Sequence, residues 1–454
     1  MKKKVLLVSV NSNRDFVPSA TAYLKVSAEK NALVNREYQL EIVDCQISGN
    51  AATEKAGSPS KKKHEKAFSI YRKITLLEKQ ILALKPFIVS FSCQVWNAKV
   101  VLGLVKALKC AAPGLIIVAG GPGADESLVG GGVDFVVVGE GEEAFTGLLL
   151  HFLGKKQLST IPGLCYTEGG EAKNSSRAIV RDLSVIPSPC LQGIFSRKPL
   201  KKYKWIPIFI TKGCPGKCAY CFEAGVPPRN FPLETVKKEI DFAVKNNYFL
   251  TFMANSAMNY SSNSAEALKY VLELKRKGKK IRVASAIEVH PAINPELLFE
   301  VLRLWEEISS EAEVEVGIQS LNKTVLENIN RGLDLAVLEK LFDYAKKSTL
   351  IFSFDLIIGL PGDNFFSFCK SLKFVMEKDA GHVNTPRLRV YKHTPLFDRA
   401  KEFGIEFGKE PFFKVIKTRD FSERALNRAE LAAGSAKAEY STDYYSGEDI
   451  EFCG

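Results

Sequence analysis

The chain has 454 residues, of which 46% are hydrophobic and 25% charged, as in an ordinary soluble globular protein. This length predicts two or three domains, and because no stretch reaches about 18 uncharged apolar residues, we expect no transmembrane helix. The net charge of +12 favours a lysine-rich solvated surface over a nucleic-acid interface, since the basic runs do not alternate with aromatic residues. Ten cysteines without disulfide-framework spacing predict a reducing, cytoplasmic environment.

Residues 1–155 alternate apolar runs with helical patterns. The start, MKKKVLLVSVNSN, is predicted to form a first strand rather than a signal peptide, because its apolar run is short and polar residues follow at once. Five strands separated by helices predict an open, parallel sheet of flavodoxin-like (Rossmann) type. The strands are expected at Val5–Val10, Gln39–Val43, Phe87–Ser92, Leu115–Ala119 and Phe135–Val138, and the helices at Thr21–Lys30, Ser69–Leu84, Ala98–Cys110 and Glu143–Leu153.

Ligands of such sheets bind at the carboxyl ends of the strands, where this chain carries unusual segments. SFSCQVWNAK follows the third strand, AGGPGADES the fourth and GEGEEAF the fifth. The glycines Gly120, Gly121 and Gly123 allow close backbone approach to a large, flat ligand. A flavodoxin-like fold without a cofactor is the alternative, and Trp96 can equally be a core residue or a wall of a pocket.

Residues 156–203 are rich in Gly, Ser, Pro and Lys, and are predicted to be a linker. We expect a short hairpin within it, from Gly163–Tyr166 to Ala178–Arg181.

Cys214, Cys218 and Cys221 follow the strand-like run Trp205–Ile210 with C-x3-C-x2-C spacing. Three thiolates at this spacing can hold three irons of a 4Fe–4S cluster and leave the fourth iron open, so we predict that they are the metal ligands and the catalytic centre. A zinc knuckle is the alternative, but zinc usually takes four ligands and no second cysteine pair is present.

From about residue 204 to 400, short strands alternate with amphipathic helices, which predicts a partial (β/α)6 barrel with its site at the carboxyl ends of the strands. The strands are expected at Ile206–Ile210, Phe249–Met253, Arg282–Ala286, Glu313–Ile318, Ile351–Ile358 and Pro386–Tyr391. The helices are expected at Leu233–Asn246, Ala265–Lys277, Pro295–Ile308, Leu335–Lys347 and Phe365–Lys378.

The cysteine motif with Tyr220 resembles the radical SAM superfamily, and the loops of the first domain resemble its cobalamin-binding branch. The resemblance covers about residues 1–400. It implies a 4Fe–4S cluster, S-adenosylmethionine (SAM) and cobalamin as cofactors, and an electron donor such as flavodoxin or ferredoxin. One departure is that no histidine follows the first strand, since His64 and His151 lie elsewhere. The resemblance therefore implies cobalamin bound without a histidine ligand.

The resemblance also implies further site residues. Tyr220 would pack near the adenine of SAM, and Asn255 stands where relatives commonly carry an acidic residue. Glu288 ends a strand, and can equally be a surface acid. The complete set of implied cofactor-binding residues is Tyr220, Asn255, Asn259, Glu288, Gln319, Ser320, Gly359 and Pro361 in the barrel, with Ser92, Cys93, Gln94, Trp96, Asn97, Gly120, Gly121, Pro122, Gly139 and Glu140 in the first domain.

Three functions stay open. The first is a methyltransferase that acts on an unactivated carbon through a 5′-deoxyadenosyl radical and methylcobalamin. The second is a radical enzyme that rearranges or cyclises its substrate, and the third is a decayed cobalamin and Fe–S binding protein, which Asn255 and Asp363 motivate. The substrate is unknown: a peptide, lipid, nucleotide or small metabolite all fit. The segment 401–454 is expected to be a partly ordered tail or small domain, with Cys453 folding over the cluster as a sharper hypothesis.

Overall fold

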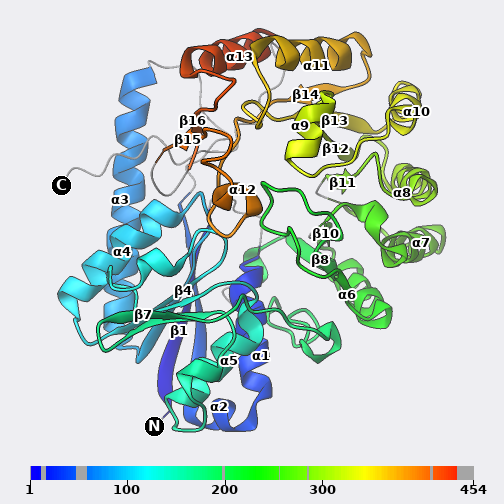
Figure 1. Cartoon of the computed structure of the whole chain (residues 1–454). Helices are drawn as coiled ribbons and strands as arrows, with labels where there is room; N and C mark the ends of the chain where they lie inside the picture. Colours follow the sequence, from blue (N-terminus) through cyan, green and yellow to red (C-terminus); the bar gives the residue numbers. More distant parts are fainter. Residues whose placement is uncertain are drawn as a thin grey trace. The chain divides into compact units, whose positions relative to one another are not determined.

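The computed structural model describes residues 2–11, 17–47, 59–196, 200–254, 256–283, 286–408 and 413–436. Within these ranges the chain divides into two compact units, which meet in sequence between Lys204 and Trp205 (Figure 1). None of the described helices combines the length and the hydropathy of a membrane span.

The N-terminal unit is built on one twisted sheet with strand order β2-β1-β3-β4-β5-β6-β7. Strands β1 to β5 are parallel, which confirms the predicted flavodoxin-like sheet. The strands read as continuous apolar runs because helices cover both faces of the sheet. The bounds are β1 Lys3–Asn11, β2 Tyr38–Gln46, β3 Ile88–Ser92, β4 Ile116–Gly120 and β5 Phe135–Val137.

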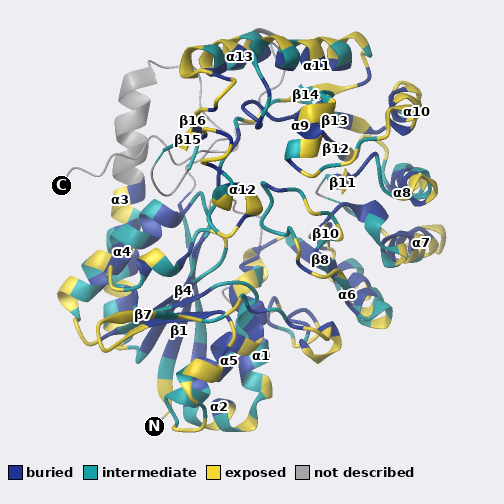
Figure 2. Ribbon diagram, in the orientation of Figure 1, coloured by how far each residue is buried: buried dark blue, intermediate teal, exposed yellow. Residues whose placement is uncertain are grey.

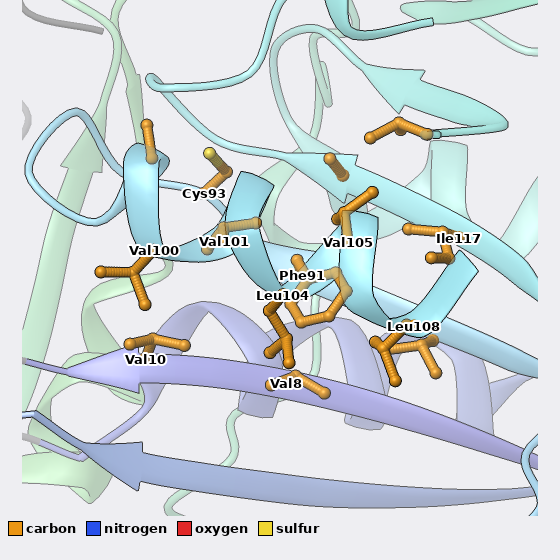
Figure 3. Close-up of a cluster of buried hydrophobic side chains, with 14 of the residues drawn as sticks. Val8, Val10, Phe91, Cys93, Val100, Val101, Leu104, Val105, Leu108 and Ile117 are labelled. Atoms are coloured by element: carbon orange, nitrogen blue, oxygen red, sulfur yellow. The ribbon is translucent and has the colours of Figure 1, made fainter. Parts of the chain in front are cut away.

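A hydrophobic core lies on each face of this sheet, and alternate side chains of β1 pack into one core or the other. Val8 and Val10 pack with α3 and α4 on one face, whereas Val5 and Leu7 pack with α1 and α5 on the other. Figure 2 shows β1 largely in the colour of buried residues, and Figure 3 shows Val8 close to Leu104 of α4. The helices are α1 Ser19–Lys30, α2 Ala32–Glu37, α3 Pro59–Ala83, α4 Ala98–Ala111 and α5 Gly141–His151.

The predicted linker contributes to this sheet. Its hairpin is present, but the second strand was placed wrongly: β6 (Leu164–Glu168) turns directly into β7 (Glu171–Asn174). The reason is Gly169–Gly170, whose positive φ angles of 61° and 83° form a tight two-residue turn. β6 also pairs antiparallel with β5, so the hairpin extends the sheet.

The C-terminal unit is a partial barrel whose main strands run parallel, while the short β9 pairs antiparallel with β8. One sheet has the order β10-β8-β9 and the other the order β11-β12-β13-β14; between them, Leu250 of β10 forms an isolated parallel bridge to Val283, which precedes β11 in the chain. Residues Ile206, Ile208 and Ile210 alternate along β8 and are fully buried. The bounds are β8 Trp205–Lys212, β9 Arg229–Asn230, β10 Phe249–Ala254, β11 Ile287–Val289, β12 Glu313–Gln319, β13 Ile351–Leu356 and β14 His382–Asn384.

Two barrel strands differ from the prediction. The third regular strand, β11, begins at Ile287 rather than within Arg282–Ala286, of which residues 284 and 285 lie outside the described residues. The sixth strand, β14, precedes Pro386, and the predicted segment Pro386–Tyr391 forms only isolated bridges. Pro386 lacks a backbone N–H and cannot donate to a strand ladder.

The predicted helices lie in an arc outside the strands (Figure 1). Local sequence fixes their starts: Asn294 caps α8 with Pro295 in the first turn, and Asn364 forms a capping box with Ser367 at α11. The short α9 was not predicted. The bounds are α6 Leu233–Lys245, α7 Ser262–Arg276, α8 Pro295–Ile308, α9 Lys323–Asn328, α10 Leu335–Ala345 and α11 Phe365–Glu377.

In the segment after residue 400, the described residues 401–408 and 413–436 form a short helical and strand-containing extension of the barrel. Strands β15 (Glu406–Phe407) and β16 (Val415–Lys417) pair antiparallel, and α13 (Glu423–Ala436) packs along α11 (Figure 1). Leu426 and Ala429 of α13 are fully buried. Cys453 lies outside the described residues.

Candidate functional site

The three cysteines share one loop that begins where β8 ends. Gly213 starts this loop with φ +76°, and a Cβ there would lie 2.1 Å from the carbonyl oxygen of Pro227, so only glycine fits. The next residue, Cys214, donates its backbone N–H to Val226 O at 3.0 Å. The return of the chain at residues 226–227 therefore fixes the position of the first cysteine.

The cysteine sulfurs are half-buried and gathered around the loop. The backbone N–H groups of Gly216 and Glu223 donate to the sulfurs of Cys214 (3.3 Å) and Cys221 (3.4 Å). A Cβ on Gly216 would lie 3.2 Å from Cys214 Sγ and 4.0 Å from Cys218 Sγ, so these two sulfurs face the same space. Among the described residues, no three His, Cys, Asp or Glu side chains are grouped to hold a single metal ion.

Burial raises the pKa of Cys214, and it raises the pKa of Cys221 to about 11. Both groups are therefore thiols at neutral pH in the metal-free protein. Iron binds thiolates, so the loading of a cluster would release protons from this loop. The three sulfurs, their spacing and the surrounding N–H donors fit a 4Fe–4S cluster held at three irons.

A distant segment, residues 329–331, braces the cysteine loop. The cysteine motif does not predict this segment, because nothing in the motif points to a partner more than a hundred residues away. The three hydrogen bonds run from Ala219 N to Ile329 O (2.8 Å), from Asn330 Nδ2 to Lys217 O (3.1 Å) and from Arg331 Nη1 to Cys218 Sγ (3.3 Å).

Arg331 connects the cysteine loop to the barrel. Its guanidinium donates to the hydroxyl of Tyr220 at 3.3 Å and to the carbonyl of Gly317 on β12 at 2.5 Å. Leu396, in the Thr-Pro-Leu segment, donates its N–H to Ala219 O at 2.8 Å. The loop is thus fixed from two sides by residues outside the motif.

Carboxylates on three adjacent strands lie near this loop. Glu288 of β11 is paired in register with Glu315 of β12, and Asp355 of β13 is paired with Gly317. Glu288 is accessible to solvent, yet the surrounding protein raises the pKa of its carboxyl, against the opposing effect of Arg331. Burial, then the charges of Glu315 and Glu288, raise the pKa of Asp355 to about 7. These three carboxyls therefore form a cluster of interacting acidic side chains, each of which holds its proton more tightly than a free carboxyl does.

Gln319 keeps a hydrogen-bond acceptor without a partner, whereas the side chain of Asn259 is engaged in internal hydrogen bonds. Gln319 ends β12 with φ +69°, and its amide nitrogen lies 2.6 Å from the point where a Cβ of Gly317 would stand, beside Arg331. Its Oε1 is buried without a hydrogen-bond partner, so it can accept from a ligand. Asn259 is fully buried and bonded to His290 and Ile293, which fixes the loop after β11.

The remaining predicted barrel residues hold loops in place. Ser320 accepts from the N–H of Asn322 at 3.1 Å. Pro361 O accepts from Asn328 Nδ2 at 3.1 Å, and a Cβ on Gly359 would lie 3.0 Å from Leu426 of α13. Asn255 lies outside the described residues.

In the N-terminal unit, Asn97 joins the ends of two strands. It is almost fully buried, and its Nδ2 donates to Val10 O at the end of β1 (3.0 Å) and to Ser92 O at the end of β3 (3.1 Å). Its Oδ1 accepts from Gln94 N at 2.7 Å. All its polar atoms are engaged, so Asn97 shapes the loop.

Cys93, Gly121 and Gly123 form the contact between two loops. Cys93 is fully buried and donates its thiol to Gly123 O at 3.2 Å. Gly121 has φ +109°, and a Cβ on it would lie 2.6 Å from Cys93 O; one on Gly123 would lie 2.6 Å from the backbone of Gln94. Because Gly121 and Gly123 carry no side chain, the loop that contains Cys93 and Gln94 can pack directly against their backbone.

Gly139 and Glu140 contact the segment 156–203, which the sequence predicted to be a linker. A Cβ on Gly139 would lie 2.4 Å from Ala178 O, and Glu140 Oε2 accepts from Val180 N at 2.6 Å. Eight predicted residues stay at least partly accessible at the carboxyl edge of the sheet: Ser92, Gln94, Trp96, Gly120, Gly121, Pro122, Gly139 and Glu140. A Cβ on Gly120, at the end of β4, would contact Val137.

The described part of this edge presents no histidine side chain. His151 lies in the last turn of α5, which returns to the amino end of the sheet, and its Nδ1 lies 3.0 Å from Lys156 O. His64 lies on α3, in the part whose side chains are not described. The partly accessible Gln94 and Trp96 could border a flat cofactor at this edge, where no described side chain is a histidine.

Two family models match this chain. The model of the radical SAM superfamily matches residues 208–375, and the model of the B12 binding domain matches residues 72–149. The first match contains the cysteine loop and Arg331. The second contains the loops after β3, β4 and β5.

Two curated relatives are methyltransferases by name. The chain is 28% identical over 331 residues to the 2-(S-pantetheinyl)-carbapenam-3-carboxylate methyltransferase of Streptantibioticus cattleyicolor, covering 68% of this chain and 46% of the relative. It is 26% identical to the cobalamin-dependent radical SAM methyltransferase TokK of Streptomyces tokunonensis, covering 68% and 47%. The chain thus spans about half the length of these relatives.

Solved structures share the fold. The methyltransferase TsrM from Kitasatospora setae, with tryptophan and a SAM analogue bound, aligns with a TM-score of 0.68 and 16% identity over 90% of this chain and 79% of that one. The cobalamin-dependent radical enzyme OxsB, with aqua-cobalamin and SAM bound, aligns with a TM-score of 0.68 and 15% identity over 95% and 66%.

Proposed function

We propose that this chain, which matches the models of the radical SAM superfamily and of the B12 binding domain, is a cobalamin-dependent radical SAM methyltransferase acting on an unactivated carbon. The observation that carries the proposal is the half-buried C-x3-C-x2-C loop in a chain that also contains a B12-binding domain. When bound, the cluster with SAM supplies a deoxyadenosyl radical for hydrogen abstraction, and cobalamin supplies the methyl group.

In this proposal, Cys214, Cys218 and Cys221 hold three irons, and the brace from residues 329–331 keeps their loop in place. The acidic side chains of Glu288 and Asp355 lie near the cysteine loop, and a bound, positively charged SAM would favour their ionised forms. Gln319, with its unpartnered carbonyl oxygen, offers a hydrogen-bond acceptor beside it.

The N-terminal unit holds cobalamin in this proposal. Gln94, Trp96 and Pro122 provide the accessible surface, whereas Asn97 and Gly121 keep the loops in position. No described histidine lies at this edge, so Gln94 and Trp96 would contact the cofactor there without an imidazole among them. An electron donor such as flavodoxin or ferredoxin completes the system, and the substrate is a separate question.

The test is a product assay on the full chain. The protein is purified without oxygen, its cluster is rebuilt, and hydroxocobalamin, reductant and SAM are added before 5′-deoxyadenosine and S-adenosylhomocysteine are quantified. We expect both products from the wild type and from Cys110→Ala, which removes an exposed cysteine outside the loop, but neither from Cys218→Ala.

Deoxyadenosine without S-adenosylhomocysteine would contradict methyl transfer and favour a radical rearrangement or cyclisation. Neither product, with full iron and cobalamin content and with candidate substrate extracts present, would favour a binding protein with a decayed site.

A further inference from the structure

A tyrosine outside the cysteine motif lies against the cysteine loop. The hydroxyl of Tyr260 hydrogen-bonds to the sulfur of Cys214. The point where a Cβ of Gly216 would stand lies 3.1 Å from this hydroxyl and 3.2 Å from the Cys214 sulfur, so both groups border the same small space. Gly216 leaves that space open to the tyrosine.

The position of Tyr260 is fixed by its neighbours. The preceding residue, Asn259, is clamped by hydrogen bonds to the loop that follows β11. Tyr260 donates its own N–H to Ala257 O at 3.1 Å, and its ring lies 5.9 Å from the ring of His290. The hydroxyl therefore reaches the sulfur from a rigid turn at the start of α7.

The other two cysteines have different partners. Cys218 faces the guanidinium of Arg331 at 3.3 Å, whereas Cys221 accepts from the backbone N–H of Glu223. Tyr260 thus adds a side-chain donor to the one sulfur that also accepts from the N–H of Gly216. A donor at a ligating sulfur withdraws electron density and stabilises the more negative, reduced cluster.

We propose that Tyr260 is a positioning residue that raises the reduction potential of the bound cluster by donating its hydroxyl proton in a hydrogen bond to Cys214 Sγ. The inference rests on the cluster of the proposed function. Reduction adds one electron, supplied by the external donor, to the cluster, and the hydroxyl proton stays on Tyr260. The hydrogen bond therefore lowers the free-energy cost of transferring an electron from the external donor to the cluster.

The test is an EPR-monitored potentiometric titration of the reconstituted full chain without oxygen, for the wild type and Tyr260→Phe. We expect the variant to have the same iron and sulfide content and a lower midpoint potential. At a fixed potential its ratio of reduced to oxidised cluster should fall about three- to tenfold, where tenfold corresponds to about 59 mV for one electron. The matched control is Tyr270→Phe, which removes a hydroxyl that bonds to Asp241 on the surface, and it should leave the potential unchanged.

An unchanged potential in a fully loaded Tyr260→Phe protein would overturn the inference. If the wild type itself takes up no cluster, the proposed function fails instead, so the two failures are distinct. If only the variant fails to take up iron, 3-fluorotyrosine incorporated in the wild type tests the same point. Fluorination makes the hydroxyl a stronger donor, so the potential should rise, and an unaltered value then contradicts the role.

Discussion

At the carboxyl edge of the N-terminal sheet, most motif residues contact neighbouring loops of the same edge. The cysteine loop of the C-terminal unit is instead held by hydrogen bonds from residues outside its motif. Asn97, Gly121 and Glu140 all bond to or pack against neighbouring loops of their own unit. Cys214 and Cys218, by contrast, keep half-buried sulfurs close to one another, and a distant side chain, Arg331, braces the loop.

The difference shows that a motif residue can mark either a ligand or the scaffold of a ligand site. A large, flat ligand needs a surface of fixed shape, so glycines and a buried amide that set the loop conformation recur with it. A metal cluster needs particular donor atoms, so its ligands are chemically fixed while their support can come from any part of the fold.

The largest expected effect is at the cysteine loop. Cys218→Ala removes one ligand of three, so we expect loss of the cluster and deoxyadenosine formation at background level. Iron and sulfide analysis together with the product assay measures both. Thermal unfolding should change little, because Cys218 is only half-buried; a large loss of stability would show that this loop, too, is mainly scaffold.

In the N-terminal unit, we expect Asn97→Ala to weaken cobalamin binding by lowering the free energy of unfolding, not by removing a contact with the cofactor. It removes three internal hydrogen bonds and leaves buried backbone groups unpaired, which costs on the order of 3 kcal/mol. Denaturant unfolding measures the free energy, and cobalamin binding should weaken in parallel. Gln94→Ala is the companion variant, since we expect it to weaken cobalamin binding at nearly unchanged stability; the reverse pattern would contradict the division between scaffold and surface.

Gly121→Ala tests the loop contact itself. The new Cβ would overlap Cys93 O, so we expect a loss of about 2–3 kcal/mol in the free energy of unfolding. Gly130→Ala is a matched control, because Gly130 also has a positive φ but has nothing within 4 Å of its Cβ position. It should cost only about 1 kcal/mol for the backbone strain. Equal losses in the two variants would show that φ alone, and not the packed loop, requires glycine.

The smallest expected effect is a pH dependence at Asp363. Burial raises the pKa of its carboxyl to about 6, despite hydrogen bonds from Ser367 and Asn364. The folded protein therefore binds this proton more tightly than the unfolded chain does, and the contribution to stability is lost as the pH rises from about 4 to 6. Asp363→Asn should remove this loss, of about 2 kcal/mol, from a series of unfolding curves between pH 4 and 7. An unaltered pH profile would contradict it.

Much of the fold was predictable because its signals are local. The five parallel strands are continuous apolar runs, and the outer helices carry amphipathic periodicity that packing against a sheet requires. The misplaced second strand of the hairpin and the misplaced β14 have local causes as well, in Gly169–Gly170 and Pro386. Helix α13 was missed because its pattern lies in a segment whose partner, α11, is known only after folding.

The sequence by itself determined the chemistry of the cysteine loop, because three thiols within eight residues need no other part of the chain to define their spacing. It also determined where the sheet and the barrel begin. Only the tertiary structure decided that Tyr260 and residues 329–331 meet this loop, that Glu288, Glu315 and Asp355 share one interior, and that Asn97 and Gly121 serve as scaffold. These relations depend on strand register and on loops that converge in space, and neither is encoded in the residues of any one segment.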